Sequence, residues 1–315
     1  MTIDIGIVLN AVLTLFFLIM VGYAARRLNI IDDAFSKKLS NLVIVIGQPF
    51  MLIGALLQND YSPELLKTGL FIVLIALAAH ILLALLAHIF ALGYREPEER
   101  KILEFSMIFA NCAFIGFPIL EAAFGPEGLF YGSFYVISFN IFMWSYGMIV
   151  LGRGRDDIKM SPKKMFLNYG TTPCIIGLLL YIWQLDLPVF FVDAAGFLGS
   201  LCTPISTLVI GGLLATRTLR ELLMSGKIYL FCLYKLLVIP VILTVVAALC
   251  QLDDVLVYLV AIMCGLPTAA NTAMFAEIYD IKPGWAAQAV GVSSLLSALT
   301  IPAVIFAARL IIGLI

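Results

Sequence analysis

Charged residues and histidine are scarce in this chain of 315 residues. Asp, Glu, Lys and Arg make up 12% of the sequence, hydrophobic residues make up 63%, and only two histidines are present. Together with a mean hydropathy of +1.08, this composition excludes a soluble globular domain and indicates a polytopic membrane protein surrounded by lipid. The formal net charge of −1 says nothing about partners, and we expect no nucleic-acid partner.

Motifs of intramembrane enzymes are also missing. The chain lacks HExxH and GxGD, its Asp pairs lack a third Asp at prenyltransferase spacing, and both histidines fall on one predicted span. The six cysteines form no CxxC pair, so disulfides and zinc are not expected, and we interpret these cysteines as buried small hydrophobes. We therefore expect no catalytic residue, no cofactor and no metal.

Apolar runs of about 20 residues predict ten membrane spans. They cover residues 6–25, 38–57, 69–92, 102–123, 128–152, 166–184, 195–215, 228–250, 255–278 and 284–312. The first run is too long for a cleaved signal peptide and is expected to be a span. With the N-terminus outside, every one of the 19 basic residues except Lys67, Arg309 and the intramembrane Lys235 faces the cytoplasm. The positive-inside rule therefore predicts a cell-membrane protein with both termini outside.

A shift of 157 residues superposes parts of the two halves of the chain. Residues 54–57 (GALL) fall on 211–214 (GGLL), residues 64–69 (ELLKTG) on 221–226 (ELLMSG), and Pro126 on Pro283. The identities are few, and chance is the alternative. We predict a first five-span repeat at residues 1–152, a cytoplasmic loop at 153–165 and a second repeat at 166–315. Since five is odd, the second repeat enters the membrane inverted, as in many secondary transporters.

Two polar segments interrupt predicted spans at matching places in the halves. Residues 110–118 (ANCAFIGFP) lie in the fourth span, and residues 265–272 (GLPTAANT) lie in the ninth. We predict breaks at Ala110–Asn111 and at Pro267–Thr268. Proline removes a backbone donor and opens a helix, whereas the fourth span has no proline at its break. Non-helical backbone at this depth is tolerated only against protein or a water-filled cavity, which points to a transporter's binding site.

A small organic anion is the predicted occupant of this site. The Asn111 amide can donate to a carboxylate, and a half-helix starting after Pro267 can present free N–H groups and its positive dipole end. Helix capping and kinking are the alternatives, and close packing is favoured for Gly116 and Pro118. The candidate substrate-binding residues are Gln48, Asn111, Cys112, Phe114, Gly116, Phe117, Pro118, Leu266, Pro267, Thr268, Ala269, Ala270 and Asn271.

Titratable side chains inside the spans are few, and three are candidates for coupling. His80 lies near the middle of the third span and can carry a proton, with a helix-packing hydrogen bond as the alternative. Lys235 lies about two turns into the eighth span, or it snorkels to the cytoplasmic face. Glu277 follows the break of the ninth span and either gates or pairs with a base. No carboxylate cluster indicates a sodium site, so we expect proton coupling or uncoupled anion transport.

In these motifs the chain resembles the auxin efflux carrier family, the bacterial relatives of the plant PIN auxin exporters. The matching stretches are residues 22–28 (GYAARRL), 111–118 (NCAFIGFP), 235–240 (KLLVIP), 266–270 (LPTAA), 276–279 (AEIY) and 300–302 (TIP), in order along the whole chain. Plant members have Pro-Asn where this chain has Ala110-Asn111. That departure puts auxin-like selectivity in doubt. Bacterial relatives are associated with dicarboxylates or with compounds not yet known.

The resemblance implies an all-α fold like those of sodium–proton antiporters and bile acid symporters. Spans 1, 2, 6 and 7 would form a scaffold that joins a homodimer, and spans 3–5 with 8–10 would form a moving transport domain. Spans 4 and 9 would be broken and cross beside the substrate. We therefore expect a secondary active transporter of small organic anions working by alternating access, with export as one candidate direction. A channel or uncoupled facilitator is the first alternative, and an intramembrane enzyme is the second.

Overall fold

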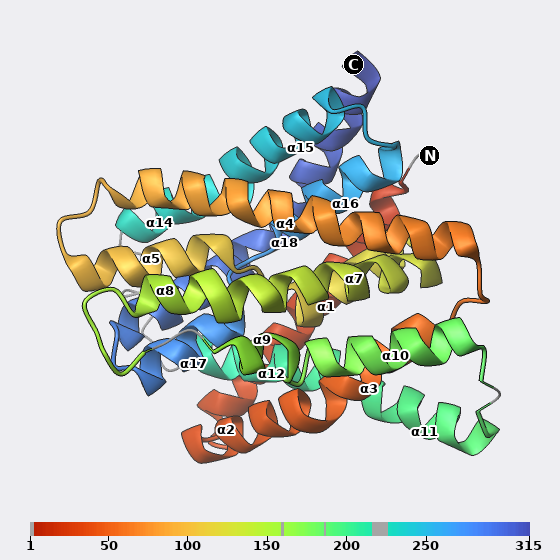
Figure 1. Cartoon of the computed structure of the whole chain (residues 1–315). Helices are drawn as coiled ribbons and strands as arrows, with labels where there is room; N and C mark the ends of the chain where they lie inside the picture. Colours follow the sequence, from red (N-terminus) through yellow and green to blue (C-terminus); the bar gives the residue numbers. More distant parts are fainter. Residues whose placement is uncertain (1–2, 159–160, 186, 216–225) are drawn as a thin grey trace.

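The computed structural model describes residues 3–158, 161–185, 187–215 and 226–315, and these residues are almost entirely helical (Figure 1). Three basic residues assigned to the cytoplasm, Lys159, Arg217 and Arg220, lie outside the described residues. Residues 221–225, which belong to the stretch that matches residues 64–69, also lie outside them. Within the described residues, the only β-type pairing is an isolated bridge between Ala110 and Thr268.

The first half of the chain begins its helices with capping residues and prolines. The Asp4, Asp32 and Ser62 side chains accept hydrogen bonds from first-turn N–H groups, and proline starts α4, α5 and α7, where the missing N–H is harmless. The elements, in which η marks a π-helical segment, are α1 (Ile5–Arg27), α2 (Asp33–Leu42), η1 (Val43–Gly47), α3 (Gln48–Leu57), α4 (Pro63–Ala91), α5 (Pro97–Ile108), η2 (Cys112–Gly116), α6 (Phe117–Phe124), α7 (Pro126–Phe142), η3 (Met143–Gly147) and α8 (Met148–Leu151).

The second half departs from the predicted boundaries in two places. Residues 167–170 are not helical, because the Asn168 side chain accepts from the N–H groups of Gly170 and Thr171 and so starts a new helix there. The seventh predicted span begins earlier than expected, at Val189. The elements are α9 (Pro162–Phe166), α10 (Thr171–Trp183), α11 (Val189–Ser200), α12 (Cys202–Ala215), α14 (Gly226–Leu233), η4 (Tyr234–Val238), α15 (Ile239–Leu249), α16 (Asp254–Gly265), α17 (Ala270–Ile278) and α18 (Pro283–Leu314).

Seven continuous helical stretches in the described part of the chain are long and apolar enough to cross a membrane. They are Ile5–Arg27, Asp33–Leu57, Pro63–Ala91, Pro126–Leu151, Val189–Ala215, Gly226–Leu249 and Pro283–Leu314. Three shorter apolar helices, Cys112–Phe124, Thr171–Trp183 and Asp254–Gly265, accompany them. The chain is therefore an all-helical, multi-pass membrane protein.

Several helix pairs pack closely. α1 lies along α12, and α3 packs against α10 and α11. Two glycines let the α1 and α12 backbones touch: a Cβ on Gly22 would lie 2.2 Å from the Leu208 carbonyl oxygen, and one on Gly211 would lie 2.0 Å from that of Ile19. α4 packs with α5 and α7, α16 packs with α15 and α18, and α18 also contacts both α1 and α12. Figure 1 shows both chain ends at the same end of the molecule.

Candidate functional site

Two spans are interrupted at the candidate site, and their non-helical segments lie side by side. α5 ends at Ile108 and α16 ends at Gly265, and each chain continues as a short extended segment before the next helix starts. The segments run antiparallel: the Asn111 N–H donates to the Pro267 carbonyl at 2.8 Å, and the Ala269 N–H donates to the Phe109 carbonyl at 3.0 Å. We call this pairing, residues 109–111 with 266–269, the crossing.

Side chains of the crossing fix the two segments in place. The Thr268 N–H donates to Ser293 Oγ of α18 at 3.1 Å, and the Thr268 hydroxyl donates to the Ser106 carbonyl of α5 at 3.3 Å. Thr268 is fully buried. The fourth span needs no proline to break, because the Asn111 carbonyl accepts from the N–H groups of Ile115 and Gly116 and so starts the new helix.

Both helices that leave the crossing present free N–H groups. Ala113 and Phe114 near the start of η2, and Ala270 and Asn271 at the start of α17, donate no backbone hydrogen bond to any described residue. Orphan donors of this kind are expected in the first turn of a helix. The sequence predicts free amides directly after Pro267, but the Thr268 N–H donates to Ser293 Oγ and the Ala269 N–H donates to the Phe109 carbonyl. The free N–H groups of α17 therefore begin at Ala270, one residue after Ala269.

A small cavity of about 30 Å³ is lined by the four residues that carry these N–H groups. No charged residue is among the described residues that line it. Asn111 is 4% exposed, and its side-chain nitrogen has no hydrogen-bond partner. The lining residues are Gln48, Ala110, Asn111, Cys112, Ala113, Phe114, Val136, Phe139, Asn140, Ala269, Ala270 and Asn271. Seven of them, namely Gln48, Asn111, Cys112, Phe114, Ala269, Ala270 and Asn271, are among the residues that the sequence analysis singled out.

Asn140 of α7 lines the cavity and was not predicted. Its side-chain nitrogen donates to the Val136 carbonyl at 2.9 Å, one turn earlier on the same helix. The signal was available, because an amide in the middle of an apolar run is as unusual there as Asn111 is in the fourth span.

The remaining predicted site residues pack the crossing instead of lining the cavity. A Cβ on Gly116 would lie 2.8 Å from Leu266 Cδ1, so glycine lets these two segments approach. The Phe117 ring lies against Gly132 of α7, where a Cβ would be 2.8 Å away. Pro118, Pro267 and Thr268 are likewise absent from the lining. Of the three large apolar residues among the candidates, Phe114, Phe117 and Leu266, only Phe114 lines the cavity.

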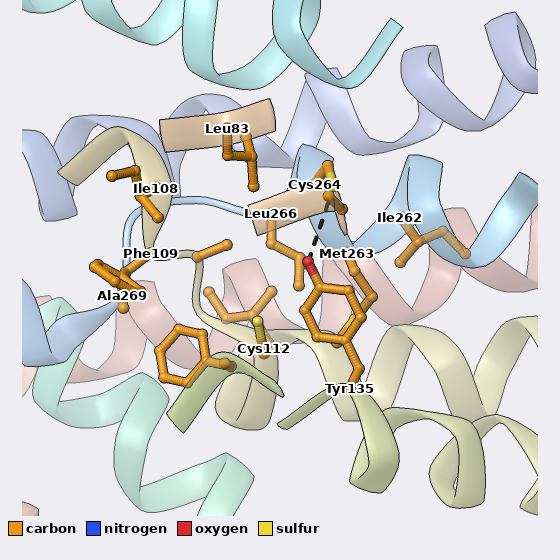
Figure 2. Packing of buried hydrophobic residues seen from close by; sticks show 14 of the residues in the cluster. Leu83, Ile108, Phe109, Cys112, Tyr135, Ile262, Met263, Cys264, Leu266 and Ala269 are labelled. Atoms are coloured by element: carbon orange, nitrogen blue, oxygen red, sulfur yellow. Dashed lines mark hydrogen bonds between the residues drawn. The ribbon is translucent and has the colours of Figure 1, made fainter. Parts of the chain in front are cut away.

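Figure 2 shows the apolar packing around the crossing, which includes Leu83, Ile108, Ile262 and Met263. Within it the Tyr135 hydroxyl and the Cys264 thiol lie 3.9 Å apart. Five of the six cysteines are buried as expected, and the interpretation is wrong for Cys250, which is exposed where α15 ends.

The three coupling candidates lie in different surroundings. His80 is buried, its Nδ1 bonds the Ala76 carbonyl at 2.6 Å, and its ring lies among the rings of Phe109, Tyr135, Phe139 and Phe142. Lys235 is also buried and donates to the Met107 carbonyl of α5 at 2.7 Å. Glu277 is exposed at the end of α17 and does not reach the cavity.

Ion pairs brace the N-terminal part of α5 and the loop that precedes it. Glu104, 1% exposed, accepts two hydrogen bonds from Arg153 at 2.6 and 2.9 Å. Lys227 of α14 lies 3.0 Å from Glu99, and Lys282 at the start of α18 pairs with Glu96, whose carboxylate holds the pKa of Lys282 above its ordinary value. α5 is thus held to α8, α14 and α18 before it reaches the crossing.

Comparison with known proteins assigns the chain to a family. The family described as membrane transport protein matches residues 7–165 and 156–305. An uncharacterized transporter of Methanocaldococcus jannaschii is 25% identical over 301 residues, covering 93% of this chain and 96% of the relative. Another, of Methanothermobacter thermautotrophicus, is 20% identical over 295 residues, covering the same shares. The chain therefore belongs to the membrane transport proteins of the auxin efflux carrier family, a family of transporters and not of enzymes.

Proposed function

We propose that the protein is a secondary active transporter of small organic anions that works by alternating access. The substrate carboxylate binds at the cavity beside the crossing, where it accepts from the Asn111 side-chain nitrogen and from the free N–H groups of η2 and α17. One observation carries this assignment: the residues at two helix starts that hold four unpaired N–H groups, together with Asn111 and its unpaired buried amide, line one cavity that has no charged residue among its described lining residues.

The positive partial charge of the two helix starts supports an anion as the ligand. Each helix start carries roughly half a positive elementary charge, and an environment of low dielectric strengthens its attraction for a carboxylate. No arginine or lysine lines the cavity, so the anion is held by dipoles and hydrogen bonds and not by an ion pair. A cavity of about 30 Å³ is small for an organic acid, so binding requires the neighbouring helices to separate, as alternating access demands.

The proposed architecture has ten spans arranged as two inverted repeats of five. α5 and α16 begin 157 residues apart and end 157 residues apart, and α7 and α18 also begin 157 residues apart. This is the offset found in the sequence. Two overlapping matches to one family cover the two halves of the chain. We assign residues 1–152 and 166–315 to the repeats, joined by a cytoplasmic loop at 153–165, and place both termini outside the cell membrane.

We further propose a division into a scaffold and a transport domain. The scaffold comprises spans 1, 2, 6 and 7, in which α1 packs on α12 and α3 packs on α10 and α11. The transport domain comprises spans 3–5 and 8–10 and contains the crossing. Movement of one group past the other would expose the cavity to each side in turn. A homodimer joined through the scaffold completes the proposal.

An anion channel or uncoupled facilitator is the second candidate, because amides and broken helices also line pores. Reconstitution of the purified protein into liposomes distinguishes the two. Monocarboxylates and dicarboxylates are first screened for those that raise the thermal unfolding temperature, with and without sodium and across pH. Uptake of a stabilising acid should then saturate and should accelerate when unlabelled acid is loaded inside. Flux that rises linearly with concentration and ignores the inner side would reject the carrier.

A further inference from the structure

Lys235 is a fully buried lysine within the continuous helical stretch Gly226–Leu249. Its ammonium donates to the Met107 carbonyl at 2.7 Å. In the part of the chain that the structure describes, no carboxylate forms an ion pair with it. The titratable groups close enough to interact with it electrostatically are His80, Cys112 and Cys264. An ammonium buried without an anionic partner is costly, so another negative group must compensate for it.

The carbonyl end of α5 is that negative group. The last carbonyls of a helix have no partner within the helix, and together they carry roughly half a negative elementary charge. In α5 the Phe105 carbonyl accepts from the Phe109 N–H at 3.1 Å, and the Ser106 carbonyl accepts from the Thr268 hydroxyl. Met107 comes next, and its carbonyl accepts from Lys235. A charged side chain from another span therefore completes the end of α5.

This contact lies directly beside the anion cavity along the chain. Met107 precedes Asn111 by four residues, and the residues between them form the paired segment of the crossing. α16 also ends there, at Gly265, so a second carbonyl end adds negative potential. Without a positive charge these two ends would weaken the attraction of the helix starts for an anion. A bound metal cation would supply that charge, and Lys235 supplies it as part of the chain.

We propose that Lys235 is a built-in counter-cation. Its ammonium takes the place of a bound metal ion at the carbonyl end of α5, holds that end in the crossing, and lets the neighbouring cavity accept an anion without sodium. Lys235 is a positioning residue in this scheme, because Met107 and not the substrate receives its hydrogen bond. The consequence for the anion depends on the proposed function, whereas the consequence for cation dependence does not.

The test measures thermal unfolding of the purified protein without any substrate, in choline chloride, sodium chloride or methylammonium chloride at one ionic strength. The wild-type protein should unfold at the same temperature in all three salts. Lys235→Ala should unfold at least about 4 °C lower in choline chloride, and methylammonium or sodium, which fit the space left by the side chain, should recover part of that loss. Lys235→Arg should behave like the wild type.

Lys227→Ala is the matched control, since Lys227 precedes Lys235 by two helical turns but forms an exposed ion pair with Glu99. Its unfolding temperature should not depend on which cation is present. Sodium-specific stabilisation of the wild type, full stability of Lys235→Ala in choline chloride, or an unfolding temperature of Lys235→Ala that is the same in choline chloride as in methylammonium chloride would each overturn the proposal. If Lys235→Ala does not fold, Lys235→Gln replaces it, and wild-type stability of that variant would overturn the proposal equally. An anion screen without hits rejects the proposed substrate and leaves this result standing.

Discussion

Replacing Asn111 by alanine should weaken substrate binding without destabilising the empty protein. The Asn111 side-chain nitrogen is buried and has no hydrogen-bond partner, so its removal breaks no bond in the unliganded state. A buried, unpaired polar group costs about 1–3 kcal/mol, and the free energy of unfolding should therefore stay constant or rise slightly. The backbone at this position has φ −79° and ψ 63° and needs no asparagine.

Binding should change in the opposite direction. A hydrogen bond to a charged group contributes about 1.5–3 kcal/mol, which corresponds to a loss of affinity of about 10- to 150-fold. Thermal unfolding without ligand gives the stability, and titration with the acid identified by the screen gives the affinity. Thr272→Val is the control, because the Thr272 hydroxyl is also buried and unpaired but lies outside the cavity wall. Unchanged affinity in a normally folded Asn111→Ala protein would refute the site assignment.

Five further substitutions test the packing, the ion pairs and the buried histidine. Gly211→Ala should lower the free energy of unfolding by about 1–3 kcal/mol, because the new Cβ meets the α1 backbone at 2.0 Å, whereas Gly54→Ala in α3 meets nothing within 4 Å and should raise it by about 0.5–1 kcal/mol; a denaturation series that ranks them otherwise contradicts the α1–α12 contact. Arg153→Gln should destabilise more than Glu104→Gln, by about 3 against about 1.5 kcal/mol, because only the first leaves a buried carboxylate without its guanidinium partner, held by the Tyr146 hydroxyl and His88 alone; the reverse order in thermal unfolding contradicts this. His80→Gln should lower stability and keep the pH profile of uptake if the ring has the packing role, because it lies among aromatic side chains and bonds its own helix; a flattened profile would support the proton-carrying role instead.

The breaks in the two helices were predictable because their residues are unusual in an apolar run. Proline at Pro267, glycine at Gly116 and amides at Asn111 and Asn271 all weaken a membrane helix or mark its ends, and the structure interrupts helix within a few residues of each. Patterns of this kind depend only on local chemistry. They can therefore be recognised in a single sequence without any knowledge of the fold.

The identity of the free donors was not predictable, because it depends on the register of the crossing. One pair of bonds, from Asn111 to Pro267 and from Ala269 to Phe109, decides which amides are consumed. Side-chain direction was equally hidden: Phe114 and Phe117 are three residues apart, yet Phe114 lines the cavity and Phe117 packs on α7. The rotation of each half-helix follows from its packing against other spans, which the local sequence does not record.

The crossing contains both signs of its helix dipoles, and this arrangement would let the proposed anion carrier work without a charged residue among the described residues of its cavity. The residues at the starts of η2 and α17 that hold free N–H groups line the cavity, while the Lys235 ammonium donates to the Met107 carbonyl at the end of α5. An arginine in the cavity would bind an anion more tightly through paired hydrogen bonds, but a carrier must also release its substrate on the far side. Dipoles and a single amide give an attraction that opening of the site to water can dissipate, because water raises the dielectric around exposed N–H groups. The fixed charge of Lys235 does not move with the substrate, so it favours anion entry without travelling as a coupled ion.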